Sequence, residues 1–239
     1  MDDLVNKRIA VIPARGGSKR IPKKNIIDFF GKPMISWTIE SALETNLFDK
    51  VIVSTDNEEI AEISRSFGAE VPFLRNKYMD DFSPVSLATL STLEQYYEYS
   101  GKSYDTVIQL MPNCPLRSGK DIKSQLDFFY KKQEKFSVLS GFNYGMFNPW
   151  WAHFLDENNN YKQIFKDFST SKRSQDLDPL VCPSGATWIS SVNNLKKFKS
   201  FYSNDYTFYK SDWYKLVDID SYEDLILAKA AHKILNEES

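Results

Sequence analysis

The first half of the chain alternates between short, wholly apolar runs and longer segments in which apolar residues recur every three or four positions. Wholly apolar runs are typical of strands buried on both faces of a sheet, and the longer periodic segments are typical of helices packed against it. The pattern predicts strands at residues 8–12, 50–55, 71–74 and 106–111, and helices at 33–45, 57–67, 84–99 and from about 119. This alternation indicates an α/β fold with a mostly parallel sheet, which binds ligands at the carboxyl ends of its strands.

Capping residues mark the ends of the predicted helices. Small polar side chains before a helix accept hydrogen bonds from its first free N–H groups, and a glycine commonly follows its last turn. The predicted helix starts are Asp56, Ser83, Ser118 and Ser221, and Gly68 is expected to close the second helix.

The alternation stops near residue 143. Between about 143 and 182, short aromatic segments surround an Asp-Glu-Asn-Asn-Asn turn, which predicts an inserted lobe. Its aromatic side chains are equally compatible with a small core and with a subunit interface. The core pattern then resumes with a strand at 185–190, a helix at 192–198, a strand at 214–220 and a last helix at 222–235. Residues 1–239 are therefore expected to form a single domain with a lobe.

Composition limits the classes of protein that the chain could represent. The 239 residues carry a formal charge of -2, which argues against broad, non-specific binding of nucleic acid. The sequence has no recognisable signal peptide and no apolar stretch of about 20 residues, so we expect a cytoplasmic protein without a membrane span. Its two cysteines, Cys114 and Cys182, are too few for a disulfide framework. His153 and His232 have no evident Ser or Cys partner, which disfavours nucleophilic catalysis.

A basic loop, "PARGGSKRIPKKN", directly follows the first predicted strand. It is either a solvated turn or an anion site. Its position between a strand and a helix, and a glycine pair that lets backbone N–H groups approach a ligand, favour a phosphate site. The spacing matches neither a P-loop nor a dinucleotide fingerprint. The cations of this loop are Arg15, Lys19, Arg20, Lys23 and Lys24.

Near the end of the chain, "VDID" places Asp218 and Asp220 two residues apart in a predicted strand. Alternate side chains of a strand point to the same side, so the two carboxylates could hold Mg²⁺, although an acidic turn before a helix is an equally good interpretation of this motif alone. Together with the basic loop, the pair predicts a nucleotide site. Such a site suits phosphoryl or nucleotidyl transfer, which depends chiefly on positioning and charge stabilisation.

Four segments in order match the signatures of one enzyme family. "PARGGSKRIPKKN" is similar to its opening signature, "KVIVSTDNEEIAEIS" to its second βα unit, "PNCPLRSGKDI" to its Pro-x-x-Pro-Leu-Arg segment and "VDIDSYEDL" to its closing metal motif. The chain thus resembles the acylneuraminate cytidylyltransferases, the CMP-sialic acid type of synthetase, almost from end to end. The resemblance implies a three-layer αβα, Rossmann-like nucleotide-diphospho-sugar transferase fold, and a homodimer in which the small inserted lobe contacts the partner subunit.

The resemblance also implies a reaction and a set of site residues. The anomeric hydroxyl of a nine-carbon keto-acid sugar attacks the α-phosphorus of CTP, and pyrophosphate leaves. The triphosphate is assigned to Arg15, Gly16, Gly17, Ser18 and Lys19, and the α-phosphate to Lys24 and Asn25. Cytosine is assigned to Arg75 and Ser83, the sugar to Met111, Arg173 and Gln175, and Mg²⁺ (or Mn²⁺) to Asp218 and Asp220. Lys24, Arg15 and Asp218 are the expected catalytic residues, and Arg20 and Lys23 are interpreted as solvated.

Three departures from the family pattern concern the sugar or the base more than the reaction. Met111 replaces a common Gln, Ser184 replaces the usual Asn before Gly-Ala, and Pro84 and Val85 replace small polar residues. The sugar is therefore left open among sialic, legionaminic, pseudaminic and related acids. The alternatives are a synthetase for the eight-carbon sugar Kdo, another sugar nucleotidyltransferase of this fold, and a non-catalytic nucleotide-binding regulator.

Overall fold

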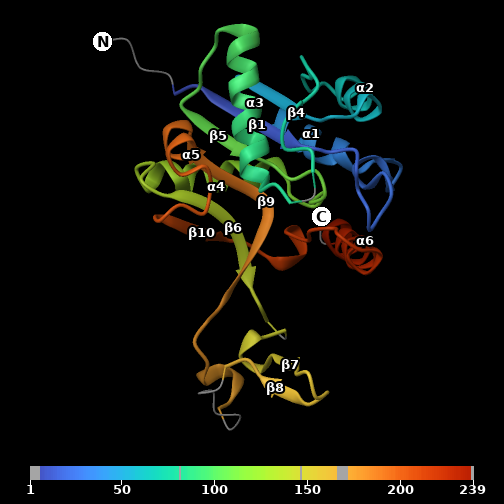
Figure 1. Ribbon diagram of the computed structural model, residues 1–239, viewed down its shortest axis with the longest axis vertical. Coiled ribbons are helices and arrows are strands. Elements are labelled where there is room, and N and C mark those ends of the chain that lie inside the picture. The colour runs from blue at the N-terminus through green and yellow to red at the C-terminus, as the bar shows by residue number, and fades with distance from the viewer. Residues whose placement is uncertain (1–5, 81, 146, 166–171, 238–239) are drawn as a thin grey trace.

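A computed structural model describes residues 6–80, 82–145, 147–165 and 172–237. These residues form a six-stranded sheet in the order β10-β6-β9-β5-β1-β4 (Figure 1). Strand β1 is parallel to β4 and β5, β10 is parallel to β6, and β9 is antiparallel to both of its neighbours. The strands are β1 Arg8–Pro13, β4 Lys50–Ser54, β5 Thr106–Gln109, β6 Ser137–Asn143, β9 Val181–Ser191 and β10 Tyr206–Lys210. The expected mostly parallel α/β sheet is confirmed.

Helices cover both faces of this sheet. They are α1 Met34–Leu43, α2 Glu58–Ser66, α3 Val85–Ser100, α4 Gly119–Lys131, α5 Val192–Phe198 and α6 Tyr222–Glu237. Side chains alternate across β1: Ala10 and Ile12 belong to a buried cluster with α1, α2 and α4, and Ile9 and Val11 to a second cluster with α3 and α5. Burial on both faces explains why residues 9–13 of β1 are all apolar, and it gives the three layers that the family resemblance implies.

Shorter elements lie outside the central sheet. They are η1 Lys24–Ile26, β2 Asp28–Phe29, β3 Lys32–Pro33, η2 Pro149–Trp151, β7 His153–Leu155, β8 Tyr161–Gln163, η3 Ser174–Asp176 and η4 Trp213–Lys215. Strands β7 and β8 pair only with each other, and Figure 1 shows their hairpin well away from the main sheet, beyond the ends of β6 and β9. The lobe is defined here as the described residues among 144–180. No helix in the described ranges is long and apolar enough to cross a bilayer.

Two predicted strands are wrong. Residues 71–74 form no strand, because the Arg65 guanidinium takes the carbonyl oxygen of Val71, and only Glu70 makes an isolated bridge to β4. Residues 214–220 form η4 and then an irregular segment, in which the Ile219 amide donates to the Asn113 carbonyl at 2.9 Å. Conversely, β6 and β10 were not expected.

Two predicted helix starts are also wrong. Helix α2 is capped by Asn57, whose Oδ1 accepts from the Ile60 amide at 3.0 Å. Asp56 instead accepts a hydrogen bond from the Gly16 amide. Ser83 makes no cap, because its hydroxyl donates to Asp80 at 2.7 Å and Pro84 precedes the first turn of α3. The prediction is confirmed at Ser118 and Ser221, each of which exchanges hydrogen bonds with an Asp three residues later.

Candidate active site

A cleft of about 270 Å³ opens at the carboxyl ends of β1 and β5. Its lining comes from the basic loop after β1, from residues among 75–80 and 83–88, and from the two loops that carry residues 111–113 and 218–220. Of the residues predicted from the sequence, the structure brings these to its wall: Arg15, Ser18, Lys19, Lys24, Asn25, Arg75, Ser83, Met111, Asp218 and Asp220. Residues more than 200 positions apart in the chain therefore share one cleft.

The basic loop is held in place by contacts beneath it. The Gly16 amide donates to Asp56 Oδ1 at 2.8 Å, and a Cβ added to Gly16 would lie 2.9 Å from the Asn57 Cβ. Buried Asn25 donates from its side chain to the Arg15 carbonyl at 2.9 Å. Gly16 and Gly17 do not line the cleft, the Gly16 amide is bound to Asp56, and close packing against Asn57 requires the glycine. The assignment of both glycines to the triphosphate stays a prediction.

Asp218 and Asp220 face each other across Asn113. The Asn113 side-chain amide donates to Asp218 Oδ1, to Asp220 Oδ1 at 3.3 Å and to the Ile219 carbonyl at 3.1 Å. Burial, followed by the charge of Asp220, raises the pKa of Asp218 to about 6. Burial also acts to raise the pKa of Asp220, but hydrogen bonds and charge from Lys24 and Arg20 outweigh it and hold that pKa below its usual value.

The donor set at this pair suits a hard divalent cation. Two carboxylates lie together at a cost in repulsion that a cation would relieve, and the Asn113 Oδ1 is buried without a hydrogen-bond partner. The described residues contain no group of three or more Asp, Glu, His or Cys side chains placed to enclose a metal. Mg²⁺ fits such an open set, because it commonly keeps waters and takes its other ligands from substrate phosphates.

Arg75, Tyr78, Asp80 and Ser83 also form part of the wall. Arg75 is almost fully buried and donates from Nη1 to the carbonyl oxygen and hydroxyl of Ser54, at 3.1 and 3.2 Å. Burial lowers its pKa, which the charge of Asp56 partly opposes. The Ser83 hydroxyl donates to Asp80, and this bond, with the amides of residues 82 and 83, lowers the pKa of Asp80 to about 2. The wall therefore presents both a cation and a carboxylate.

The departures from the family pattern occupy different places. Met111 and Val85 line the cleft, and a Cβ added to Gly185 would lie 2.9 Å from the Met111 Cγ and 3.1 Å from Asp218 Oδ2. Ser184 is buried behind the wall and donates to the Leu216 carbonyl at 2.9 Å. Met111 thus gives this end of the cleft an apolar surface, whereas Ser184 does not line the cleft and holds the segment at Leu216 in place.

Comparison with known proteins identifies the family of this chain. The cytidylyltransferase family model matches residues 9–167. The chain belongs to the cytidylyltransferase family. The pseudaminic acid cytidylyltransferase of Campylobacter jejuni serotype O:2 is 34% identical over 97% of this chain and 98% of its own length. The CMP-N,N'-diacetyllegionaminic acid synthase of Legionella pneumophila is 31% identical over 82% of each chain.

The family fold is also seen in a solved structure of CMP-2-keto-3-deoxy-manno-octonic acid synthetase complexed with CTP. Its TM-score is 0.68 at 17% identity, and the match covers 98% of this chain and all of that one. At this identity the likeness shows the fold. Together with the family match, it confirms the resemblance drawn from the four sequence segments.

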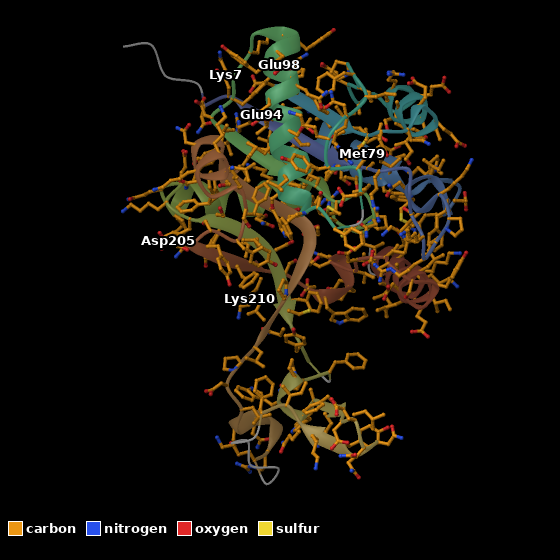
Figure 2. The ribbon with its side chains drawn as sticks, viewed as in Figure 1. Lys7, Met79, Glu94, Glu98, Asp205 and Lys210 are labelled. Carbon is orange, nitrogen blue, oxygen red and sulfur yellow. The ribbon has the colours of Figure 1, made fainter. Side chains whose placement is uncertain are left out.

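Two residues predicted to contact the sugar lie outside the cleft. Arg173 and Gln175 are exposed on the lobe, and Arg173 pairs with Asp176 at 2.9 Å. Lys210, at the end of β10, lies at the lower edge of the body in Figure 2, and the lobe extends beyond it. Within one chain the lobe therefore does not bring these side chains to the cleft.

Sequence reasoning missed two functional candidates. Asn113 lay in a quoted motif without a role, because its contacts to Asp218 and Asp220 exist only after residues far apart in the chain pack together. Arg20 was interpreted as solvated, but it lines the cleft and its Nη2 donates to Asp220 Oδ2 at 2.6 Å. The interpretation as a solvated residue does suit Lys23, which pairs at the exposed surface with Glu59 at 2.7 Å.

Proposed function

We propose that this protein transfers CMP from CTP to the anomeric hydroxyl of a nonulosonic acid and releases pyrophosphate. The observation that carries the proposal is the single cleft in which the basic loop after β1 meets the Asp218–Asp220 pair. Relatives named for pseudaminic, diacetyllegionaminic and N-acylneuraminic acids support a nonulosonic acid as the sugar. The eight-carbon alternative rests on a likeness of fold at 17% identity.

The cleft residues divide the work in this proposal. Arg15, Ser18 and Lys19 bind the triphosphate, and Arg75 and Ser83 bind cytosine. Asp218 and Asp220 hold Mg²⁺, or Mn²⁺ in its place, which supplies charge stabilisation to the phosphates when bound.

Bond exchange then occurs at the α-phosphorus. The sugar hydroxyl oxygen forms a bond to it as the bond to the β-phosphate oxygen breaks, and pyrophosphate leaves with that electron pair. The hydroxyl proton goes to Asp218, directly or through a water. Lys24, beside Asn25, stabilises the charge that develops on the phosphoryl oxygens.

The sugar that fits best is pseudaminic acid. An apolar Met111 in the wall replaces an amide, and the C. jejuni pseudaminic acid enzyme matches nearly the whole chain. A panel of four nucleotides against pseudaminic, legionaminic and N-acetylneuraminic acids and Kdo is expected to give Mg²⁺-dependent pyrophosphate release with CTP and pseudaminic acid foremost. Turnover with no CTP pair would refute the function, and turnover with Kdo alone would move the protein to the eight-carbon branch.

We further propose a homodimer in which each lobe completes the partner's cleft. The lobe exposes Phe147, Phe154 and Tyr161, of which Phe147 is 81% and Tyr161 77% accessible. Such side chains favour a subunit contact, and a partner's cleft would give Arg173 and Gln175 the anionic ligand predicted for them.

Subunit mixing tests the shared site. Asp220→Asn and Arg173→Ala subunits are each expected to be nearly inactive, whereas a refolded mixture recovers about a quarter of wild-type turnover, because half of its dimers carry one intact site. Sedimentation of the mixture should show dimers. A monomeric protein, or dimers without recovery, would refute the exchange.

A further inference from the structure

Both carboxylate oxygens of Asp220 are already paired with cations. Lys24 Nζ donates to Oδ1 and Arg20 Nη2 donates to Oδ2, each at 2.6 Å. The Asn113 side-chain amide also donates to Oδ1 at 3.3 Å. A metal ion that uses Asp220 as a ligand therefore competes with these donors for the carboxylate and is repelled by the two cations.

Arg20 is the cation that leaves more readily. Its side chain is 68% exposed, whereas the side chain of Lys24 is 16% exposed. An exposed ion pair is weakened by water and by salt, while Lys24 is held against Asp220 at the inner side of the cleft. Oδ2 is also the oxygen that Asn113 leaves unbonded. Asp220 Oδ2 is thus the oxygen at which a metal ion can replace a cation.

The released guanidinium stays beside the substrate. Arg20 follows Ser18 and Lys19 in the basic loop, and all three line the cleft. A guanidinium presents a planar fork of N–H donors that matches phosphate oxygens as well as it matches a carboxylate. A nucleotide–metal complex is itself an ion pair. When it binds, the metal ion can pair with Asp220 and the phosphates can pair with Arg20.

We propose that Arg20 is an exchangeable counter-ion: it neutralises Asp220 Oδ2 in the nucleotide-free enzyme, yields that oxygen to the incoming divalent cation, and pairs instead with the triphosphate. The inference rests on the proposed function, because it needs the metal role of Asp220. It gives Arg20 opposite effects on the two ligands. Arg20 weakens the binding of free metal and strengthens the binding of nucleotide.

The test measures those two affinities separately. Free Mn²⁺ is titrated by its electron paramagnetic resonance signal against nucleotide-free protein, and CTP is titrated by calorimetry with Mg²⁺ and no sugar. Arg20→Ala is expected to bind Mn²⁺ about fivefold more tightly and CTP about tenfold more weakly than the wild type. Arg20→Lys keeps the charge without the fork of N–H donors, and both of its affinities should lie between those of the wild type and Arg20→Ala.

Lys23→Ala is the matched control. Lys23 is a cation of the same loop with an exposed side chain, but its partner is Glu59 and it does not line the cleft. We expect both affinities of this variant to stay within about twofold of the wild type. Unchanged or weaker Mn²⁺ binding by Arg20→Ala would overturn the exchange, since a purely structural role weakens both ligands. If Asp220→Asn bound Mn²⁺ as the wild type does, the metal assignment itself would fail.

Discussion

Asp220→Asn is expected to lower turnover by about three orders of magnitude, or about 4 kcal/mol of transition-state stabilisation, because a bound metal ion loses one of two carboxylate ligands. The same substitution should shift the melting temperature by no more than about 3 °C, since the amide has the shape of the carboxylate and the Asp220 side chain is 41% exposed. Steady-state pyrophosphate release and a thermal melt measure the two effects.

A matched pair elsewhere on the basic loop provides the control for this result. Glu59 pairs with Lys23 at 2.7 Å, as Asp220 pairs with Arg20, but it lies outside the wall of the cleft. Glu59→Gln therefore removes a comparable exposed carboxylate and is expected to keep wild-type turnover. Full activity of Asp220→Asn would remove Asp220 from the reaction, and a large loss in both variants would show that the loss of any ion pair to the basic loop disturbs it.

The elements predicted correctly are those in which the local pattern of apolar residues matches the residues that are buried. β1, β4 and β5 each contain a run of buried apolar residues, and their burial is visible in the sequence itself. The helices between them have an apolar face at helical spacing. This local information was enough to predict a mostly parallel α/β sheet, whereas the three layers were implied by the resemblance to the family.

The wrong and the missed strands have different causes. Residues 71–74 have the composition of a strand, but the Arg65 side chain takes the Val71 carbonyl that a neighbouring strand would need. The strand β10 has intermediate or exposed residues and lies at the edge of the sheet, so its pattern is weaker. Hydrogen-bond partners of this kind are set by tertiary contacts, which periodicity does not record.

The site shows the same division. The basic loop and the Asp218–Asp220 pair were recognisable because each is a compact motif. The ion pair of Arg20 with Asp220 joins residues 200 positions apart, and the bond from the Gly16 amide to Asp56 joins residues 40 apart. Sequence motifs therefore identified residues that line the cleft, and the structure adds which of them already neutralise one another.

Lys24→Ala is expected to lower kcat by about a hundredfold to a thousandfold and to weaken CTP binding by less than about tenfold. The Lys24 ammonium is part-buried at the point where the basic loop meets the carboxylate pair, and charge that develops only in the transition state benefits most from a fixed cation in such a place. Single-turnover rates and equilibrium titration of CTP separate the two effects.

Two further measurements decide how Lys24 acts. Lys23→Ala, one residue away, should change neither kcat nor CTP affinity, because Lys23 pairs with Glu59 outside the cleft wall. Free Mn²⁺ should bind Lys24→Ala at least as tightly as the wild type, since the variant frees Asp220 Oδ1 of a competing cation. A loss of CTP affinity alone would make Lys24 a ground-state contact. A loss of Mn²⁺ affinity that parallels kcat would instead make it a positioning residue for Asp220.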